Sequence, residues 1–173
     1  AIGDINNDGL EDVFLTSNQG QDHLYQNLGN LKFKKITVGA KINHSFGWST
    51  GVNITDINGD GWKDIYICRV GQYLKFKNDY NKVYINNKNG TFTESSLELG
   101  LRFSGFSTQS AFFDMDRDGD LDLYLLNHSV KDASQFRPSN SNEERFLIAL
   151  VESLQKRAIL KAKNESFNQI IFN

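Results

Sequence analysis

The sequence predicts an all-β protein: a partial β-propeller of four-stranded blades, with fewer than three complete repeats, followed by a C-terminal α-helix. An acidic nine-residue loop occurs three times, at residues 4–12, 56–64 and 114–122, and aromatic segments recur at matching distances from it. Short extended segments alternate with turn residues throughout these units. Tandem units of 52 and 58 residues, each with four such segments, are typical of propeller blades.

Each loop reads D-x-[N/D]-x-D-G-x-x-D, with oxygen-bearing side chains at positions 1, 3, 5 and 9 and Gly at position 6. Ca²⁺ prefers roughly six to eight oxygen ligands, which alternate residues of a tightly turning loop can supply together with a backbone carbonyl at position 7. Glycine permits the sharp bend. The alternative is an Asp-rich turn without metal. Three copies in register favour calcium, at about three sites.

The expected ligands follow from these positions. In the first loop they are the side chains of Asp4, Asn6, Asp8 and Asp12 and the carbonyl of Leu10. In the second they are the side chains of Asp56, Asn58, Asp60 and Asp64 and the carbonyl of Trp62. In the third they are the side chains of Asp114, Asp116, Asp118 and Asp122 and the carbonyl of Asp120. The third set has four ligating carboxylates against three, which predicts the tightest binding there.

The segments outside the loops also repeat. Residues 24–27 with Phe33 match residues 83–86 with Phe92, and the Tyr and Phe are eight apart in both copies. The second unit predicts strands at residues 49–55, 64–69, 82–87 and 91–96, with an Asn-Gly hairpin turn at residues 87–90. The blades are then residues 1–37 (partial), 49–96 and 107–130 (partial). No strand is expected before the first loop, and we interpret the chain as a piece of a longer protein.

The strand context argues against a helical EF-hand. Such a loop needs a bidentate Glu at position 12, where these loops carry Leu15, Ile67 and Leu125, and it needs a helix on both sides. Here an apolar, aromatic strand follows each loop at once. The calcium loop therefore connects the first and second strands of a blade.

Residues 131–173 depart from the repeat, and residues 142–163 have the pattern of a helix. Their apolar side chains recur at three- and four-residue steps: Leu147, Leu150, Val151, Leu154 and Ala158. This segment is either an amphipathic helix that docks on the sheet edge or a sequence unrelated to the repeat, produced by truncation or a shifted reading frame.

The loops and the LYQN…F and VYIN…F segments resemble FG-GAP or VCBS repeats, of the sort that precede ASPIC/UnbV domains in bacterial surface proteins. The resemblance covers about residues 1–130. It implies an integrin-α-like adhesion propeller, usually of seven blades, with calcium between the first two strands of a blade. It also implies a secreted, outer-membrane-associated or cell-surface location. This chain has fewer repeats than a closed propeller, so further blades of a longer chain or self-association would cover its open edges.

Charge and composition narrow the function classes. The net charge is −2, yet the three loops alone carry −10. Such clustered negative charge repels itself unless cations neutralise it. The basic residues are scattered, which argues against nucleic acid as a partner, and no apolar run is long enough to span a membrane. The lone Cys68 is expected to be a buried, inert thiol.

A possible ligand surface lies opposite the metal loops, because connections alternate sides in an up-and-down blade. It gathers aromatic and cationic residues suited to protein or carbohydrate: His44, Trp48, Arg69, Tyr73, Lys75, Phe76, Lys77, Tyr80, Arg102 and Phe103. The alternative is that these aromatics cover the blade core. No catalytic arrangement is apparent, so binding is favoured; the other possibilities are part of a calcium-dependent polysaccharide-processing enzyme and a purely structural spacer.

Overall fold

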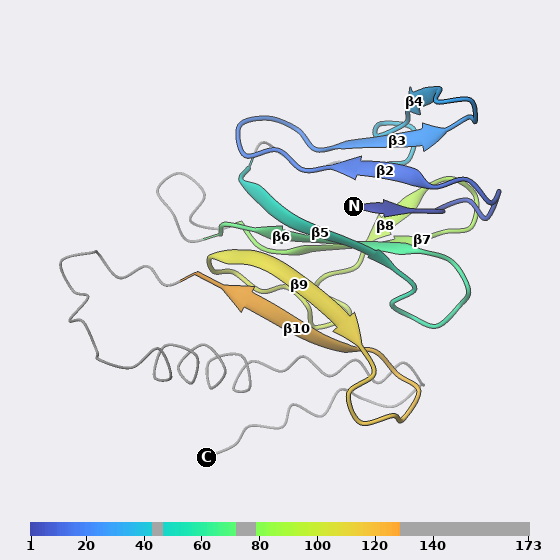
Figure 1. Cartoon of the computed structure of the whole chain (residues 1–173). Helices are drawn as coiled ribbons and strands as arrows, with labels where there is room; N and C mark the ends of the chain where they lie inside the picture. Colours follow the sequence, from blue (N-terminus) through green and yellow to red (C-terminus); the bar gives the residue numbers. More distant parts are fainter. Residues whose placement is uncertain (43–46, 72–78, 129–173) are drawn as a thin grey trace, which may run out of the picture.

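The computed structural model describes residues 1–42, 47–71 and 79–128, and the regular structure within these ranges is entirely β-strand (Figure 1). This confirms the all-β prediction. The strands are β1 (Ile2–Gly3), β2 (Asp12–Leu15), β3 (His23–Asn27), β4 (Phe33–Lys35), β5 (Ser49–Thr55), β6 (Asp64–Arg69), β7 (Lys82–Asn86), β8 (Phe92–Glu94), β9 (Ser107–Phe113) and β10 (Asp122–Asn127). The expected helix at residues 142–163 lies outside the described residues. Within them, no helix is long and apolar enough to cross a membrane.

The strands form three antiparallel sheets that follow one another in sequence order and do not close on themselves. We call β1–β4 the first blade, β5–β8 the second blade and the β9–β10 hairpin the third unit. Both blades have the strand order of the sequence, so each strand pairs with the next one along the chain. The sheets are stacked from the first blade at the top of Figure 1 to the third unit at the bottom.

The turn between β7 and β8 forms as its residues predict. Asn87 N–H donates to the Thr91 carbonyl at 2.9 Å, and the backbone is left-handed at Lys88 (φ 63°) and Gly90 (φ 79°). The first blade closes its β3–β4 turn in the same way, with Gly29 (φ 77°) at the position of Lys88. The two turns thus share a left-handed backbone at this position and at Leu31 (φ 57°), the equivalent of Gly90, while Asn30 (φ 52°) is left-handed in the first turn only.

The expectation that no strand precedes the first loop was wrong. Ile2 pairs with Val13 and Gly3 with Asp12, which makes β1 the first strand of a four-stranded sheet. A strand of two residues is too short to show an alternating pattern in the sequence. It is held in place by its pairing with β2. At Gly3, a Cβ would lie 2.5 Å from Ile54 Cγ2, so only glycine allows this approach to the second blade.

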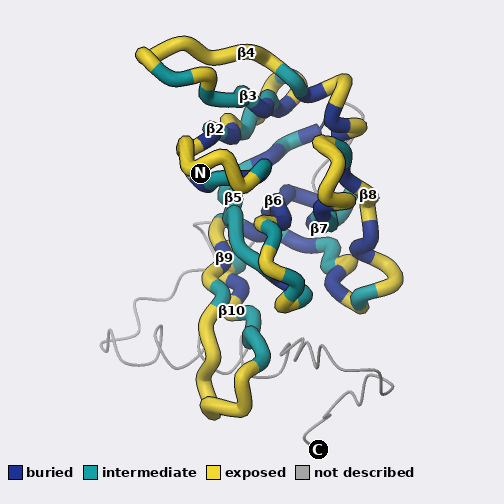
Figure 2. Tube along the Cα trace, turned by 90° about the vertical axis from the view of Figure 1, so that its right-hand side faces the viewer, coloured by how far each residue is buried: buried dark blue, intermediate teal, exposed yellow. Residues whose placement is uncertain are grey.

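Two apolar cores join the three sheets. The first lies between the blades, where Phe14 and Leu24 meet Ile65, Ile67 and Tyr84. The second lies between the second blade and the third unit and includes Tyr66, Cys68, Val83 and Leu125. Alternate residues of β6 therefore point into opposite cores, Ile65 and Ile67 into the first and Tyr66 and Cys68 into the second, and every residue of this strand is buried (Figure 2). Burial of each large apolar side chain in these cores contributes roughly 1.5–3 kcal/mol to the free energy of folding.

Cys68 is buried in the second core, as expected from its apolar neighbours. Burial raises the pKa of its thiol to about 11, because a thiolate would lose its hydration there. The thiol is therefore a packing group and not a reactive one.

A buried polar network fastens the two blades at the edge of the sheets where β6 ends. Arg69 is fully buried; its Nε donates to Asp79 Oδ2 at 2.8 Å and its Nη1 to Ser49 Oγ at 3.2 Å. Ser49 Oγ in turn donates to Asp22 Oδ2 of the first blade at 2.8 Å. A Cβ at Gly47 would lie 1.6 Å from Arg69 Nη2, so glycine leaves the room that the guanidinium occupies.

Candidate metal centre

The three acidic loops connect β1 to β2, β5 to β6 and β9 to β10, and all lie at the same edge of the stacked sheets (Figure 1). The strand context predicted from the sequence is thus correct. The glycines at position 6 have positive φ: 82° at Gly9, 86° at Gly61 and 92° at Gly119. No atom lies within 4 Å of a Cβ built at these glycines, so backbone conformation and not crowding requires them.

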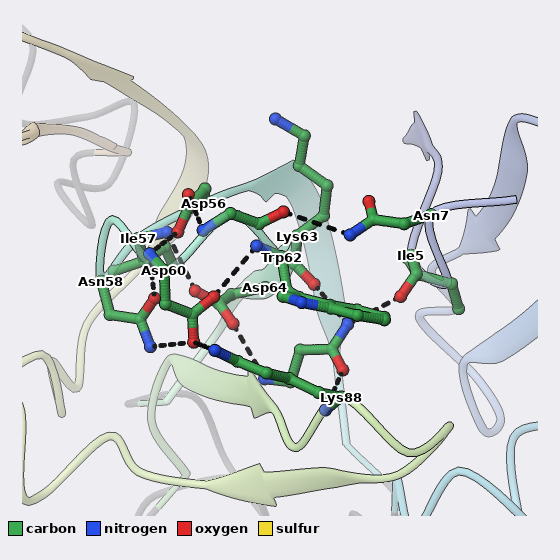
Figure 3. A network of polar contacts seen from close by, with 12 residues as sticks. Ile5, Asn7, Asp56, Ile57, Asn58, Asp60, Trp62, Lys63, Asp64 and Lys88 are labelled. Atoms are coloured by element: carbon green, nitrogen blue, oxygen red, sulfur yellow. Dashed lines mark hydrogen bonds and ion pairs between the residues drawn. The ribbon is translucent and has the colours of Figure 1, made fainter. Parts of the chain in front are cut away.

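The aspartate at position 1 points into its own loop. Its Oδ2 accepts the N–H of the position 6 glycine at 2.8 Å for Asp4, 2.7 Å for Asp56 and 3.1 Å for Asp114. In the second loop the N–H of Asp60 adds a bond to the other oxygen, at 2.9 Å (Figure 3). The turn thus curls around a carboxylate, and the same geometry recurs in all three copies.

The aspartate at position 9 fastens the loop to the sheet. Asp64 is fully buried; its Oδ2 accepts Ile57 N–H at 2.9 Å and its Oδ1 accepts Asn86 N–H of β7 at 2.8 Å. Asp12 repeats the arrangement, accepting Ile5 N–H at 3.1 Å and Asn27 N–H of β3 at 2.7 Å. This aspartate therefore has a structural role in each blade in addition to the predicted ligand role.

Sequence reasoning missed the role of the asparagine that ends β3 and β7. Asn27 Nδ2 donates to the carbonyl of Glu11 at 3.0 Å, and Asn86 Nδ2 donates to that of Lys63 at 3.0 Å, the equivalent residue. The sequence does contain a sign of this role, because an Asn occupies the last position of both the LYQN and the VYIN segment.

Burial controls the charge of these carboxyl groups. It raises the pKa of Asp64 to about 6, since a buried carboxylate loses hydration; the N–H donors of Asn86 and Ile57 oppose this and the charges of Asp60 and Asp56 add to it. Burial likewise raises the pKa of Asp12. Asp64 is therefore ionised at neutral pH only against an unfavourable environment, which a cation in the loop would offset.

The pKa of Asp60 moves in the opposite direction. Partial burial acts to raise it, but the Trp62 N–H, the Asn58 amide and the Lys88 ammonium together outweigh burial and lower it. Lys88 Nζ lies 3.3 Å from Asp60 Oδ2, so the second loop already faces a cationic side chain from the β7–β8 turn (Figure 3).

The third loop brings its carboxylates together. One oxygen from each of Asp114, Asp116 and Asp122 lies within 4.8 Å of the other two, close enough to share one metal ion. In the first two loops position 3 is Asn, whose Nδ2 donates to the position 5 carboxylate, at 2.8 Å from Asn6 to Asp8 and at 3.1 Å from Asn58 to Asp60. The side-chain atoms that could ligate a metal ion in these loops are all oxygens, as a hard cation such as Ca²⁺ requires.

The position 5 and position 7 residues, which are also expected ligands, make the same hydrogen bond in each of the three loops. The N–H groups of the position 7 residues donate to Oδ1 of the position 5 aspartates: Leu10 to Asp8 at 2.8 Å, Trp62 to Asp60 at 2.9 Å and Asp120 to Asp118 at 3.0 Å. Ligation by the position 7 carbonyls stays a prediction.

The first two loops are in contact. Asn7 Nδ2 donates to the carbonyl of Gly61 at 3.3 Å, and Asn86 Nδ2 also reaches the carbonyl of Ile5 at 2.7 Å. Because Ile5 N–H binds Asp12 and Asn86 N–H binds Asp64, a continuous chain of hydrogen bonds joins the two ninth-position carboxylates.

At the opposite edge, the aromatic and cationic residues have mixed roles. Phe103 packs against the second core. The guanidinium carbon of Arg102 lies 3.9 Å and Lys82 Nζ 4.4 Å from the centre of the Tyr80 ring. Five other expected members of this surface lie outside the described residues: His44, Tyr73, Lys75, Phe76 and Lys77.

Comparison with known families agrees with this geometry. No curated protein matches the chain. A family described as FG-GAP-like repeat matches residues 4–67 and 73–125, which together contain all three loops and all or part of every strand except β1. The chain therefore belongs to the FG-GAP-like repeat family.

Proposed function

We propose that the chain is a calcium-binding segment of a β-propeller, in which Ca²⁺ in three strand-connecting loops stabilises the blades. The observation that carries this proposal is the set of carboxylate oxygens of Asp114, Asp116 and Asp122, which lie within 4.8 Å of one another. The same loop pattern at equivalent places in both blades extends the proposal to all three loops.

The side chains at positions 1, 3, 5 and 9 and the carbonyl at position 7 would hold each ion. The ion would supply positive charge that neutralises the carboxylates, and the protein's own hydrogen bonds would hold the loop in place. The position 9 aspartate already links its loop to the third strand of the blade, as Asp64 does through Asn86. A cation held by this carboxylate would therefore tie the first, second and third strands of a blade to one another.

The calcium role is structural. An ion that binds only the folded chain stabilises it by mass action, by about 2.7 kcal/mol at one hundred times Kd. Mg²⁺ is smaller and demands a near-octahedral site, so it should substitute poorly.

Equilibrium dialysis against Ca²⁺ with metal analysis tests the proposal. The expected result is about three ions per chain, falling by about one when Asp114 and Asp116 are both replaced by Asn. The matched control, Glu98→Gln, neutralises an exposed carboxylate in the β8–β9 connection at the opposite edge and leaves the stoichiometry unchanged. No bound calcium at millimolar concentration would overturn the proposal.

For the opposite edge we infer a binding surface for protein or glycan in a secreted, outer-membrane-associated or cell-surface protein. The support is the Tyr80 ring with Arg102 against it, an aromatic and cationic pair of a kind suited to such ligands. Screening the chain and its Tyr80→Ala variant against glycan and peptide arrays tests this. Binding lost in the variant supports the surface, and no binding at all favours a structural spacer.

A further inference from the structure

Each blade has two faces, and the repeat allows them to be compared position by position. We call the face toward the preceding sheet the upstream face and the face toward the following sheet the downstream face. The interface between the two blades joins the downstream face of the first to the upstream face of the second, and the second core joins the next such pair. One type of interface thus occurs twice within the chain.

The upstream face of the first blade has the composition of a buried surface but is exposed. Leu15 is 52% exposed, whereas its equivalent in the second blade, Ile67, is 0% exposed against the first blade. Ile2 and Phe33 of the same face are exposed as well, while Phe92, the equivalent of Phe33, is buried. The strand register places Ile2, Val13 and Tyr25 side by side on this face.

The downstream face of the third unit shows the same contrast. Leu126 is 42% exposed, whereas the equivalent Cys68 is 0% exposed. Tyr124 and Met115 are also exposed, and their equivalents Tyr66 and Ile57 are buried in the second core. Only the described residues enter this comparison.

Exposed apolar residues elsewhere behave differently. Val38 and Leu97 occupy equivalent positions in the connections that follow the two blades, and they are 77% and 70% exposed. Since both copies are exposed, this position belongs to the solvent side of the repeat. The contrast between buried and exposed copies is therefore a property of the two end faces and not of exposed apolar residues in general.

We propose that the upstream face of the first blade docks on the downstream face of the third unit of a second copy of this chain. The two faces are the complementary halves of the interface already formed twice within the chain. They lie at opposite ends of the stack, so one copy cannot join its own ends (Figure 1). The contact is heterologous, and successive copies form a closed ring or an open chain. The proposal goes beyond calcium binding and does not depend on it.

Single charges on the two faces provide the test. Leu15→Glu blocks the upstream face and Leu126→Glu the downstream face, while Leu97→Glu is the control at a position exposed in both copies. Sedimentation velocity over a range of concentrations should show association of the unmodified chain and of Leu97→Glu. Each face variant alone should remain monomeric, because every copy then lacks the same half of the contact.

Mixing the two face variants gives the sharpest outcome. Their intact halves are complementary, so an equimolar mixture should form a one-to-one dimer and nothing larger. Circular dichroism establishes that each variant is folded; if one is not, Ile2→Glu and Tyr124→Glu, at exposed positions of the same faces, replace the pair. A monomeric unmodified chain at all concentrations, association of either variant alone, or a mixture without dimers would each overturn the proposal.

Discussion

Lys88 gives the second loop a charge environment that the first loop lacks. Its ammonium lies 3.3 Å from Asp60 Oδ2, and it stands at a left-handed turn position that is Gly29 in the first blade. A side chain at this position reaches over the loop, whereas glycine leaves the loop open. We infer that the lysine would compete with an ion in this loop as a tethered cation.

Lys88→Gln should therefore raise the affinity of the second loop for metal. The ion pair is half exposed, and such pairs contribute about 0.2–1 kcal/mol, so an increase of roughly 1.5- to 5-fold is expected. Terbium luminescence excited through Trp62, which lies in this loop, measures the site directly. Lys82→Gln at the opposite edge is the control. Equal affinity before and after the substitution would rule out competition.

The third loop differs from the other two by a single ligand type. Asp116 stands where the others have Asn6 and Asn58, and its carboxylate lies in the cluster with Asp114 and Asp122. Asp116→Asn should lower the affinity of the tightest calcium site by roughly tenfold, because ligand charge tunes calcium affinity. The reciprocal Asn58→Asp should raise that of the second loop. Calorimetric titration in which Asp116→Asn leaves the tightest site unchanged would show that another loop binds best.

At the scale of elements, the blade depends on the strand that follows the loop and on the asparagine that ends β7. Asn86 is buried and makes hydrogen bonds to both neighbouring loops, at Ile5 and Lys63. Its N–H also holds Asp64. One residue thereby joins an acidic loop, its own strand and the preceding blade.

Asn86→Ala should destabilise the fold by about 1–3 kcal/mol, because it leaves buried carbonyl groups without their donor. Asn87→Ala is the matched control: the neighbouring side chain is exposed, and its loss should stay within about 0.5 kcal/mol. Urea denaturation measures both. Equal effects of the two substitutions would show that the bridge between the loops contributes nothing.

Repetition made the strands predictable. Residues 49–55 and 64–69 were predicted as strands and form β5 and β6 with those bounds, because loop and turn residues mark both ends. β7 and β8 are shorter than expected, at Lys82–Asn86 and Phe92–Glu94. β1 escaped prediction because two residues carry no periodicity. The Lys88–Asp60 pair also escaped it, since a contact between two loops depends on how the strands are paired.

At the scale of the whole molecule, the sequence predicts the stacking of the sheets and the presence of open edges, but it does not identify the residues that lie exposed on those edges. A repeat in the sequence indicates that neighbouring blades share an apolar core. Phe14 of the first blade and Ile67 of the second lie in such a core. The repeat does not indicate which copy lies at an end, because the residues there remain apolar, as Leu15 does. The exposed fractions of equivalent residues, such as Leu15 and Ile67, distinguish an end face from an interior one.

Calcium-dependent melting of the whole chain tests the central claim most directly. With about three ions bound to the folded chain, excess Ca²⁺ should raise the melting temperature by several degrees, because each filled loop adds free energy by mass action. Excess chelator should abolish the increase, renewed Ca²⁺ should restore it, and Mg²⁺ at the same concentration should not. Identical melting with calcium and with chelator would contradict calcium-stabilised blades.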